Sequence, residues 1–261
     1  GRLRIELEGP DCPLLAAPEE LAELAGLMEA PMRLEDQDGD HLTLIQQEPL
    51  MAVAGIAARK KDGETVSGDA GTYFKRGDGT LYVLLCDGMG SGPQANRESS
   101  LALRLLEQFL QAGVETEHAL VTLNSALALR GEEAGGFTTV DLLQVDLFTG
   151  DGVVFKLGAA PTYVRKGGTV RRISGASLPA GLAAEERSAP DRFPIHLSPG
   201  DCVLLVSDGV TGTEDDSWLR ERLVKFDQGS PKELARDLIT HSPQGATDDS
   251  TALVIRLEKR E

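Results

Sequence analysis

Residues 81–92 read Leu-Tyr-Val-Leu-Leu-Cys-Asp-Gly-Met-Gly-Ser-Gly, and Pro93 follows at once. The apolar run up to Leu85 predicts a buried strand, and helical spacing then continues as far as Gln111. The strand would deliver Asp87 into a loop whose glycines let the backbone approach an ion or a phosphate group closely. A dinucleotide-binding loop is disfavoured because its fingerprint needs glycine where Pro93 stands, whereas an ordinary strand-turn-helix stays open.

Three more aspartates stand at the ends of strand-like runs. Asp69 follows Val-Ser-Gly, Asp208 ends an apolar run and precedes glycine, and Asp248 comes just before another apolar run. Carboxylates that share a cleft raise one another's pKa unless a cation lies between them. We therefore expect these three side chains and Asp87 to meet at a site for a hard divalent metal ion. Taken singly, each also fits a turn or a solvated acid.

The charge balance excludes two classes of partner. The 261 residues include 26 Lys and Arg against 42 Asp and Glu, which gives a formal charge of −16. Such a surface disfavours nucleic acid and anionic lipid. No apolar stretch approaches the roughly 20 residues of a membrane span, so we expect no membrane contact by this segment. Because the sequence begins at Gly1, upstream segments that attach a longer protein to a membrane stay an open alternative.

Cysteine usage favours the reducing cytoplasm. Cys12, Cys86 and Cys202 are widely spaced and form no paired motif, so we expect neither a zinc site nor disulfides. The last two lie in apolar runs and are predicted to be buried. The four histidines show no metal-ligand spacing, which gives no support to a zinc site or to a Ser-His-Asp triad.

A second acidic motif, Asp-Gln-Asp-Gly-Asp at residues 36–40, is similar to the start of a calcium-binding loop. Its glycine stands at the fourth position rather than the sixth, and the twelfth position is Gln47 instead of glutamate. We therefore interpret the segment as a polar turn.

The remaining pattern predicts the fold class. Strand-like runs occupy residues 42–45, 50–58, 81–85, 140–148, 153–157, 163–164, 170–173, 193–197, 202–206 and 251–257. Helical spacing covers residues 18–30, 93–111, 117–130 and 218–226, and a capping box at 230–233 opens one more helix. Strands and helices in separate blocks are typical of α+β proteins, here two mostly antiparallel sheets face to face with helices outside. We expect residues 1–49 to form an N-terminal helical lead-in and residues 50–261 one domain.

Taken together, the motifs resemble the PPM (PP2C-like) family of metal-dependent serine/threonine phosphatases, and most closely the phosphatase domain of its stage II sporulation protein E branch. The matching motifs follow in order over roughly residues 50–258: Ser-Gly-Asp at 67–69, Asp-Gly-Met-Gly-Ser-Gly at 87–92 with Glu98-Ser99 after it, Asn-Ser at 124–125, Thr-Val-Asp-Leu at 139–142, Leu-Gly-Ala-Ala-Pro at 157–161, Ser-Leu-Pro-Ala-Gly at 177–181, Val-Ser-Asp-Gly-Val at 206–210 and Asp-Asp-Ser-Thr at 248–251. The resemblance implies an αββα sandwich, with residues 50–261 as a PP2C-like domain that binds two Mn²⁺ or Mg²⁺ ions.

The resemblance also implies a role for each motif residue. Asp87 would bridge both ions with a carbonyl ligand from Gly88, Asp69 would hold the second ion, and Asp208 and Asp248 the first. The implied reaction is hydrolysis of phosphoserine on a partner protein by a metal-activated water. Relatives outside this branch often carry histidine two residues after the bridging aspartate, where this chain has methionine, so the general acid stays unassigned.

By the same resemblance, the expected substrate is a phosphorylated anti-anti-sigma (STAS-like) protein in the control of a bacterial sigma factor during sporulation. Homodimerisation is left open. The alternative is a catalytically silent PP2C-fold interaction module, which is disfavoured because every expected ligand position is acidic. A small-molecule phosphatase is disfavoured because no cluster of Arg or Lys flanks the motifs.

Overall fold

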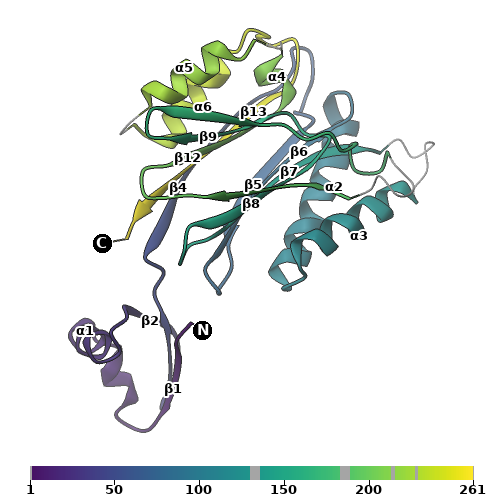
Figure 1. Ribbon diagram of the computed structural model, residues 1–261. Coiled ribbons are helices and arrows are strands. Elements are labelled where there is room, and N and C mark those ends of the chain that lie inside the picture. The colour runs from purple at the N-terminus through teal and green to yellow at the C-terminus, as the bar shows by residue number, and fades with distance from the viewer. Residues whose placement is uncertain (1, 130–135, 183–188, 213–214, 227–228, 261) are drawn as a thin grey trace. The chain divides into compact units, whose positions relative to one another are not determined.

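The computed structural model describes residues 2–129, 136–182, 189–212, 215–226 and 229–260 (Figure 1). Two compact units divide the chain. The smaller unit comprises residues 1–49 together with Arg260, and the larger unit comprises residues 50–259 with residue 261. No helix in the described residues is both long and apolar enough to cross a membrane.

The smaller unit is built on an antiparallel sheet with strand order β1-β3-β2, in which β1 spans Arg4–Glu8, β2 spans Met32–Asp38 and β3 spans His41–Gln46. A short 3-10 helix, η1 (Cys12–Ala16), and helix α1 (Pro18–Leu27) connect β1 to β2. The segment expected as a helical lead-in thus holds α1, where the pattern predicted a helix, together with three strands. Strands β1 and β2 carry few buried side chains, so no apolar run marks them in the sequence. Gly39, at φ 55°, lies in the polar turn between β2 and β3.

The larger unit holds two antiparallel sheets of five strands each within the described residues. The strands are β4 (Leu50–Arg59), β5 (Asp69–Lys75), β6 (Thr80–Gly88), β7 (Thr138–Asp146), β8 (Asp151–Leu157), β9 (Thr162–Lys166), β10 (Thr169–Ile173), β11 (Asp191–His196), β12 (Cys202–Val206) and β13 (Ser250–Lys259). One sheet has the order β10-β9-β12-β13-β4, and the other has the order β11-β8-β7-β6-β5.

Helices cover the outer face of each sheet, as Figure 1 shows. Helices α2 (Gly92–Gln111) and α3 (Thr116–Ala128) pack on the sheet that contains β6. Helices α4 (Asp208–Thr211), α5 (Ser217–Lys225) and α6 (Pro231–Thr240) belong to the other side, against the sheet that contains β12. The predicted αββα arrangement is confirmed.

Three apolar layers hold the larger unit together. The middle layer lies between the sheets and contains the fully buried side chains of Val83, Leu143 and Leu253. The two outer layers join each sheet to its helices, and they bury the predicted core cysteines Cys86 and Cys202. Burial of such apolar surface, at roughly 25 cal/mol per Å², is the main force that fixes the sandwich.

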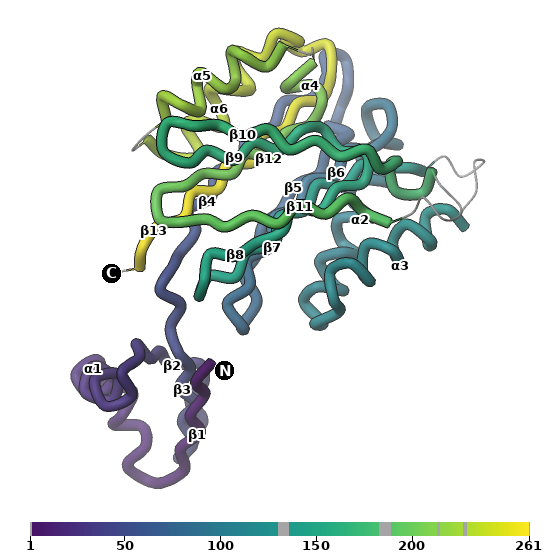
Figure 2. Tube along the Cα trace, viewed as in Figure 1, coloured from purple at the N-terminus to yellow at the C-terminus, as the bar shows by residue number. Residues whose placement is uncertain are grey.

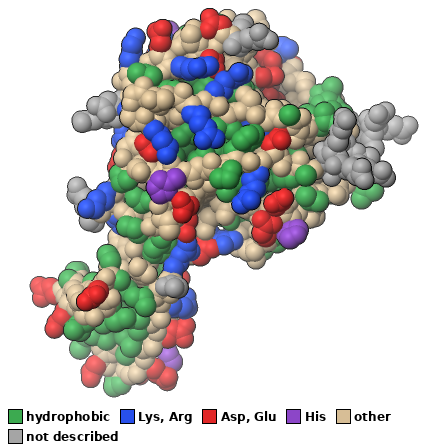
Figure 3. Space-filling view, in the orientation of Figure 1, with side chains coloured by type: hydrophobic (Ala, Val, Ile, Leu, Met, Phe, Trp, Pro, Cys, Tyr) green, Lys and Arg blue, Asp and Glu red, His purple; other side chains and the backbone are tan. Residues whose placement is uncertain are grey.

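The hairpin of β9 and β10 turns at Gly167, which has φ 53°, as the Gly-Gly pair at 167–168 indicates (Figure 2). Acidic and basic side chains are interspersed on the face of the larger unit seen in Figure 3, rather than gathered into fields of one sign. The net charge of −16 therefore does not translate into a purely acidic surface on that face.

Candidate metal centre

Strand pairing brings Asp69 and Asp87 together. Asp69 is the first residue of β5, Asp87 is the penultimate residue of β6, and the two are direct antiparallel partners. Directly opposed residues in such a pair have Cβ atoms about 5 Å apart. Two aspartates that are separate in the sequence thus become neighbours, because β5 and β6 are adjacent antiparallel strands.

The other sheet supplies Asp208 and Asp248 in a similar way. Asp208 begins α4 shortly after β12 ends, and Asp248 precedes β13, the strand that pairs with β12. The Thr251 backbone N–H donates to the Ser207 hydroxyl at 2.8 Å, and the Ser207 N–H donates to the Thr251 carbonyl at 3.0 Å. These bonds fix the two strand ends beside each other.

The strand ends of both sheets open into a cavity of about 350 Å³. Its lining consists of Lys61, Asp87, Gly88, Met89, Gly90, Phe137, Thr139, Asp208 and Asp248. Three of the four predicted carboxylates thus line one cavity. The fourth, Asp69, is only 7% exposed and is the strand partner of Asp87.

Electrostatics show how closely these carboxyl groups interact. Burial raises the pKa of Asp87 to about 9, and the charges of Asp69, Asp208 and Asp248 add to the shift. Burial likewise raises the pKa of Asp69 to about 6 and, together with the charge of Asp248, raises the pKa of Asp208. Without cations, the site therefore carries an unfavourable concentration of negative charge.

The donor set fits a hard divalent cation. Both carboxylate oxygens of Asp69 are buried and have no hydrogen-bond partner among the described residues, which leaves them free to bind an ion. Only oxygen atoms are offered by the four aspartates and the Gly88 carbonyl, and oxygen ligands suit Mg²⁺ or Mn²⁺. In the described part of the chain, no three Asp, Glu, His or Cys side chains are already drawn around one point.

The glycines that follow Asp87 and Asp208 have a steric role rather than the turn role that an Asp-Gly pair indicates. Neither Gly88 nor Gly209 has a positive φ. A Cβ on Gly88 would lie 2.1 Å from the Ala95 carbonyl oxygen, and a Cβ on Gly209 would lie 1.9 Å from the Asp249 carbonyl oxygen. Both positions need glycine because another stretch of main chain rests directly on them.

Two polar residues of the site escaped the sequence pattern. Asp249, which the sequence analysis did not single out, is 3% exposed. Its carboxylate accepts hydrogen bonds from the backbone N–H of Lys61 at 2.8 Å and of Gly68 at 2.7 Å. Lys61 itself lines the cavity, although it belongs to none of the recognised motifs. The adjacency of Asp249 to Asp248 was the one available signal, and a lone lysine gave none.

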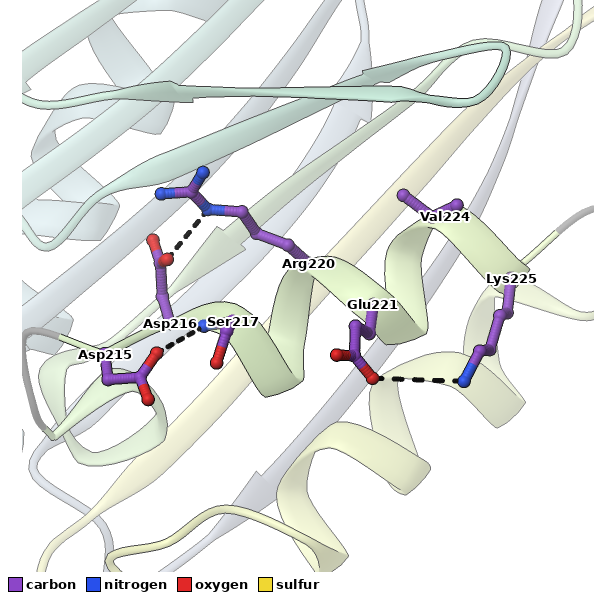
Figure 4. A pocket seen from close by; sticks show the side chains of 7 residues that line it. All are labelled: Asp215, Asp216, Ser217, Arg220, Glu221, Val224 and Lys225. Atoms are coloured by element: carbon purple, nitrogen blue, oxygen red, sulfur yellow. Dashed lines mark hydrogen bonds and ion pairs between the residues drawn. The ribbon is translucent and has the colours of Figure 1, made fainter.

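A larger hollow, of about 570 Å³, lies at the start and along one side of α5 (Figure 4). Its charged groups are paired locally, since Asp216 contacts Arg220 at 2.7 Å and Glu221 contacts Lys225 at 4.0 Å. None of the predicted ligands lines it. The cavity at the strand ends, although smaller, is therefore the candidate site.

Comparison with known proteins points to one family. The family model described as Stage II sporulation protein E (SpoIIE) matches residues 77–258. The stage II sporulation protein E of Priestia megaterium is 30% identical over 213 residues, which cover 78% of this chain and 36% of that protein. The chain thus spans about a third of the length of that relative.

Solved structures agree with this similarity. A structure of the PP2C phosphatase domain and a fragment of the regulatory domain of SpoIIE from Bacillus subtilis superimposes with a TM-score of 0.79 at 25% identity, covering 100% of this chain and 80% of that chain. RsbX, solved in complex with magnesium, shares the fold with a TM-score of 0.64 at 18% identity, covering 87% of this chain and 100% of that chain.

Proposed function

Because the chain belongs to the stage II sporulation protein E family and carries a PP2C-type serine/threonine phosphatase domain, we propose that it hydrolyses phosphoserine on a partner protein. The observation that carries the proposal is the cavity at the strand ends, where Asp87, Asp208 and Asp248 converge without a matching set of cationic side chains. Carboxylates in that arrangement are suited to hold metal ions at the site of reaction.

We propose that Asp69, Asp87, Asp208 and Asp248, with the carbonyl of Gly88, hold two Mn²⁺ or Mg²⁺ ions. When bound, such ions neutralise the carboxylates, lower the pKa of a coordinated water and polarise the phosphoryl oxygens. The similarity to RsbX, which was solved with magnesium, supports this choice of metal.

The residues around Asp87 hold it in place for this role. The Asp87 N–H donates to the Thr139 hydroxyl at 3.2 Å, and the Thr138 hydroxyl donates to the Asp87 carbonyl at 2.8 Å. Met89 and Phe137 form an apolar part of the cavity wall. Met89 cannot supply a proton, so the leaving oxygen has to receive its proton from another group or from water.

The finer proposal concerns the partner. A phosphorylated anti-anti-sigma (STAS-like) protein is the proposed substrate, and membership of the sporulation protein E family supports it. A structural neighbour that contains RsbU and RsbW domains, from Mycobacterium tuberculosis, is 19% identical and supports the fold alone.

Phosphate release from a phosphoserine protein, measured against Mn²⁺ concentration, tests the proposal. Release is expected to require Mn²⁺, to stop with a chelator and to be lost in Asp87→Asn. Asp215→Asn, an exposed aspartate away from the cavity, serves as the matched control and should keep full activity. Metal-independent release, or full activity of Asp87→Asn, would refute the site. Absence of release with every phosphoprotein tested would favour a silent interaction module.

A further inference from the structure

The acidic cavity contains one cationic side chain. Among the described residues that line it, Lys61 is the one Lys or Arg, and it faces a lining that includes Asp87, Asp208 and Asp248. A substrate phosphate is also an anion, so carboxylates alone would repel it. A cation within the same cavity offsets that repulsion directly.

The backbone of Lys61 is fixed on both sides. Its N–H donates to the buried carboxylate of Asp249 at 2.8 Å, and the N–H of the next residue, Asp62, donates to the Ala246 carbonyl at 2.9 Å. The other oxygen of Asp249 accepts from Gly68, the residue before Asp69. One buried side chain thus ties the segment that carries Lys61 to the segment that carries a predicted metal ligand.

The ammonium group of Lys61 is not used by the fold. Within the described residues, it has no hydrogen bond or ion pair, although acidic side chains line the same cavity. The neighbouring Lys60 differs, because it is exposed and its ammonium group donates to the carbonyl of Glu64. A half-buried lysine without an internal partner is available to a ligand.

We propose that Lys61 binds the phosphoryl group of the substrate and that Asp249 is its positioning residue. The proposal rests on the phosphatase function and adds a direct contact between protein and phosphate. An ammonium group forms charge-assisted hydrogen bonds with phosphate oxygens, which are roughly twice as strong as neutral ones. Lysine serves as a point charge, so no fork-shaped geometry is needed.

Binding of inorganic phosphate to the Mn²⁺-loaded protein, measured by calorimetry, tests the proposal without requiring turnover. Lys61→Met keeps the length of the side chain and removes the charge, and it should weaken phosphate binding roughly tenfold. Lys61→Arg should restore most of the affinity. Lys60→Met removes a charge one residue away and should leave the affinity unchanged. For a phosphoserine peptide, KM should rise in Lys61→Met by a similar factor, while kcat changes much less.

The role of Asp249 is tested by a double-mutant cycle. Asp249→Asn keeps one acceptor oxygen for two N–H donors, so it should loosen the Lys61 segment and weaken phosphate binding. If Asp249 acts through Lys61, the loss in the double variant should equal the loss in Lys61→Met alone. Fully additive losses would overturn the positioning role.

The outcomes separate this proposal from the phosphatase function. Unchanged phosphate affinity in Lys61→Met, with an active wild-type protein, would overturn the role of Lys61 alone. A wild-type protein that binds phosphate in a Lys61-dependent way but releases none from phosphoproteins would overturn the function and keep the phosphate site. Equal losses in Lys60→Met and Lys61→Met would indicate a general effect of charge and refute the specific contact.

Discussion

Two groups of carboxylates in the larger unit differ in how the protein balances their charge: Asp141 is paired with a buried lysine, whereas the strand-end aspartates are not paired in this way among the described residues. Asp141 and Lys156 are each 1% exposed, and the Lys156 ammonium lies 2.9 Å from the Asp141 carboxylate. The Thr162 hydroxyl donates to Asp141 at 2.5 Å and accepts from Lys156 at 2.7 Å. In contrast, both oxygens of Asp69 have no partner, and no such ion pair serves Asp87 among the described residues.

The two groups are neighbours along β7. Asp141 lies two residues from Thr139, the strand partner of Asp87, and its own strand partner is Lys156 on β8. Thr162, on β9, belongs to the other sheet, so the group of Asp141, Lys156 and Thr162 joins the two sheets. Burial lowers the pKa of Lys156, and the charge of Asp141 opposes that shift. A buried charge with its counter-charge built in is structural, whereas buried charges without one indicate a binding site for cations.

The largest expected effect is a loss of phosphatase activity when one of the strand-end aspartates is replaced. Asp208→Asn should lower kcat by more than roughly 10³-fold, because the cavity loses one of the carboxylates that we propose to hold metal ions. Its fold should persist, since removing one of several repelling charges does not open the core. Steady-state kinetics with saturating Mn²⁺, together with circular dichroism, measures both quantities. Near wild-type kcat with an intact fold would remove Asp208 from the site.

The internally paired group should respond in stability. Lys156→Met leaves Asp141 buried without its counter-charge and should lower the free energy of unfolding by about 3 kcal/mol. The double variant Asp141→Leu with Lys156→Met removes both charges and should recover much of that loss. Urea unfolding of the two variants and the wild type gives the comparison. A single variant as stable as wild type would show that the pair contributes little.

Metal ions should stabilise the folded protein only by binding the strand-end aspartates, and not through the pair of Asp141 and Lys156. At a hundredfold excess over its dissociation constant, Mn²⁺ should raise the free energy of unfolding by about 2.7 kcal/mol, because it binds the folded state. Thermal unfolding with and without chelator measures the shift. The shift should remain in Asp215→Asn and largely disappear in Asp69→Asn. An equal metal response in all three proteins would place binding elsewhere.

The smallest effect concerns pH. Folding raises the pKa of Asp87 from 3.8 to about 9, so its contribution to stability is fully present below the unfolded pKa and is lost as the pH rises between these values. In metal-free protein, Asp87→Asn removes this penalty and should add about 1 to 2 kcal/mol at about pH 8. The gain should vanish near about pH 4. Urea unfolding in chelator across this range measures it, and a gain independent of pH would contradict the assignment.

Strong periodicity made much of the fold predictable. Helix α2 spans Gly92–Gln111 against a predicted 93–111, and α6 begins at Pro231, as the capping box indicated, although the Ser230 side chain makes no capping bond. Strand β5 was missed, because Asp69–Lys75 is short of apolar residues and only partly buried. Helix α4, Asp208–Thr211, was not predicted, because four residues are too few to show helical spacing.

The site was predictable only where several motifs acted together. Strand ends in the sequence indicated that Asp87, Asp208 and Asp248 belong together, and the structure brings these three to one cavity. The placement of Asp69 depends on its register with β6, which a missed strand cannot reveal. Lys61 depends on hydrogen bonds to Asp249, 188 residues later in the chain, and no local pattern carries that information.

At Gly88 and at Gly209, another segment of main chain lies in direct contact with the glycine, so a substitution nearby cannot make room for a side chain there. A descendant that replaced a carboxylate could keep the shape of the cavity and regain catalysis by a single reversion. A descendant that acquired a side chain at either glycine would have to move the start of α2 or the segment that precedes β13. Among relatives of this chain, the loss of either glycine would therefore be harder to reverse than the loss of an aspartate, and it would indicate a lasting loss of enzyme activity.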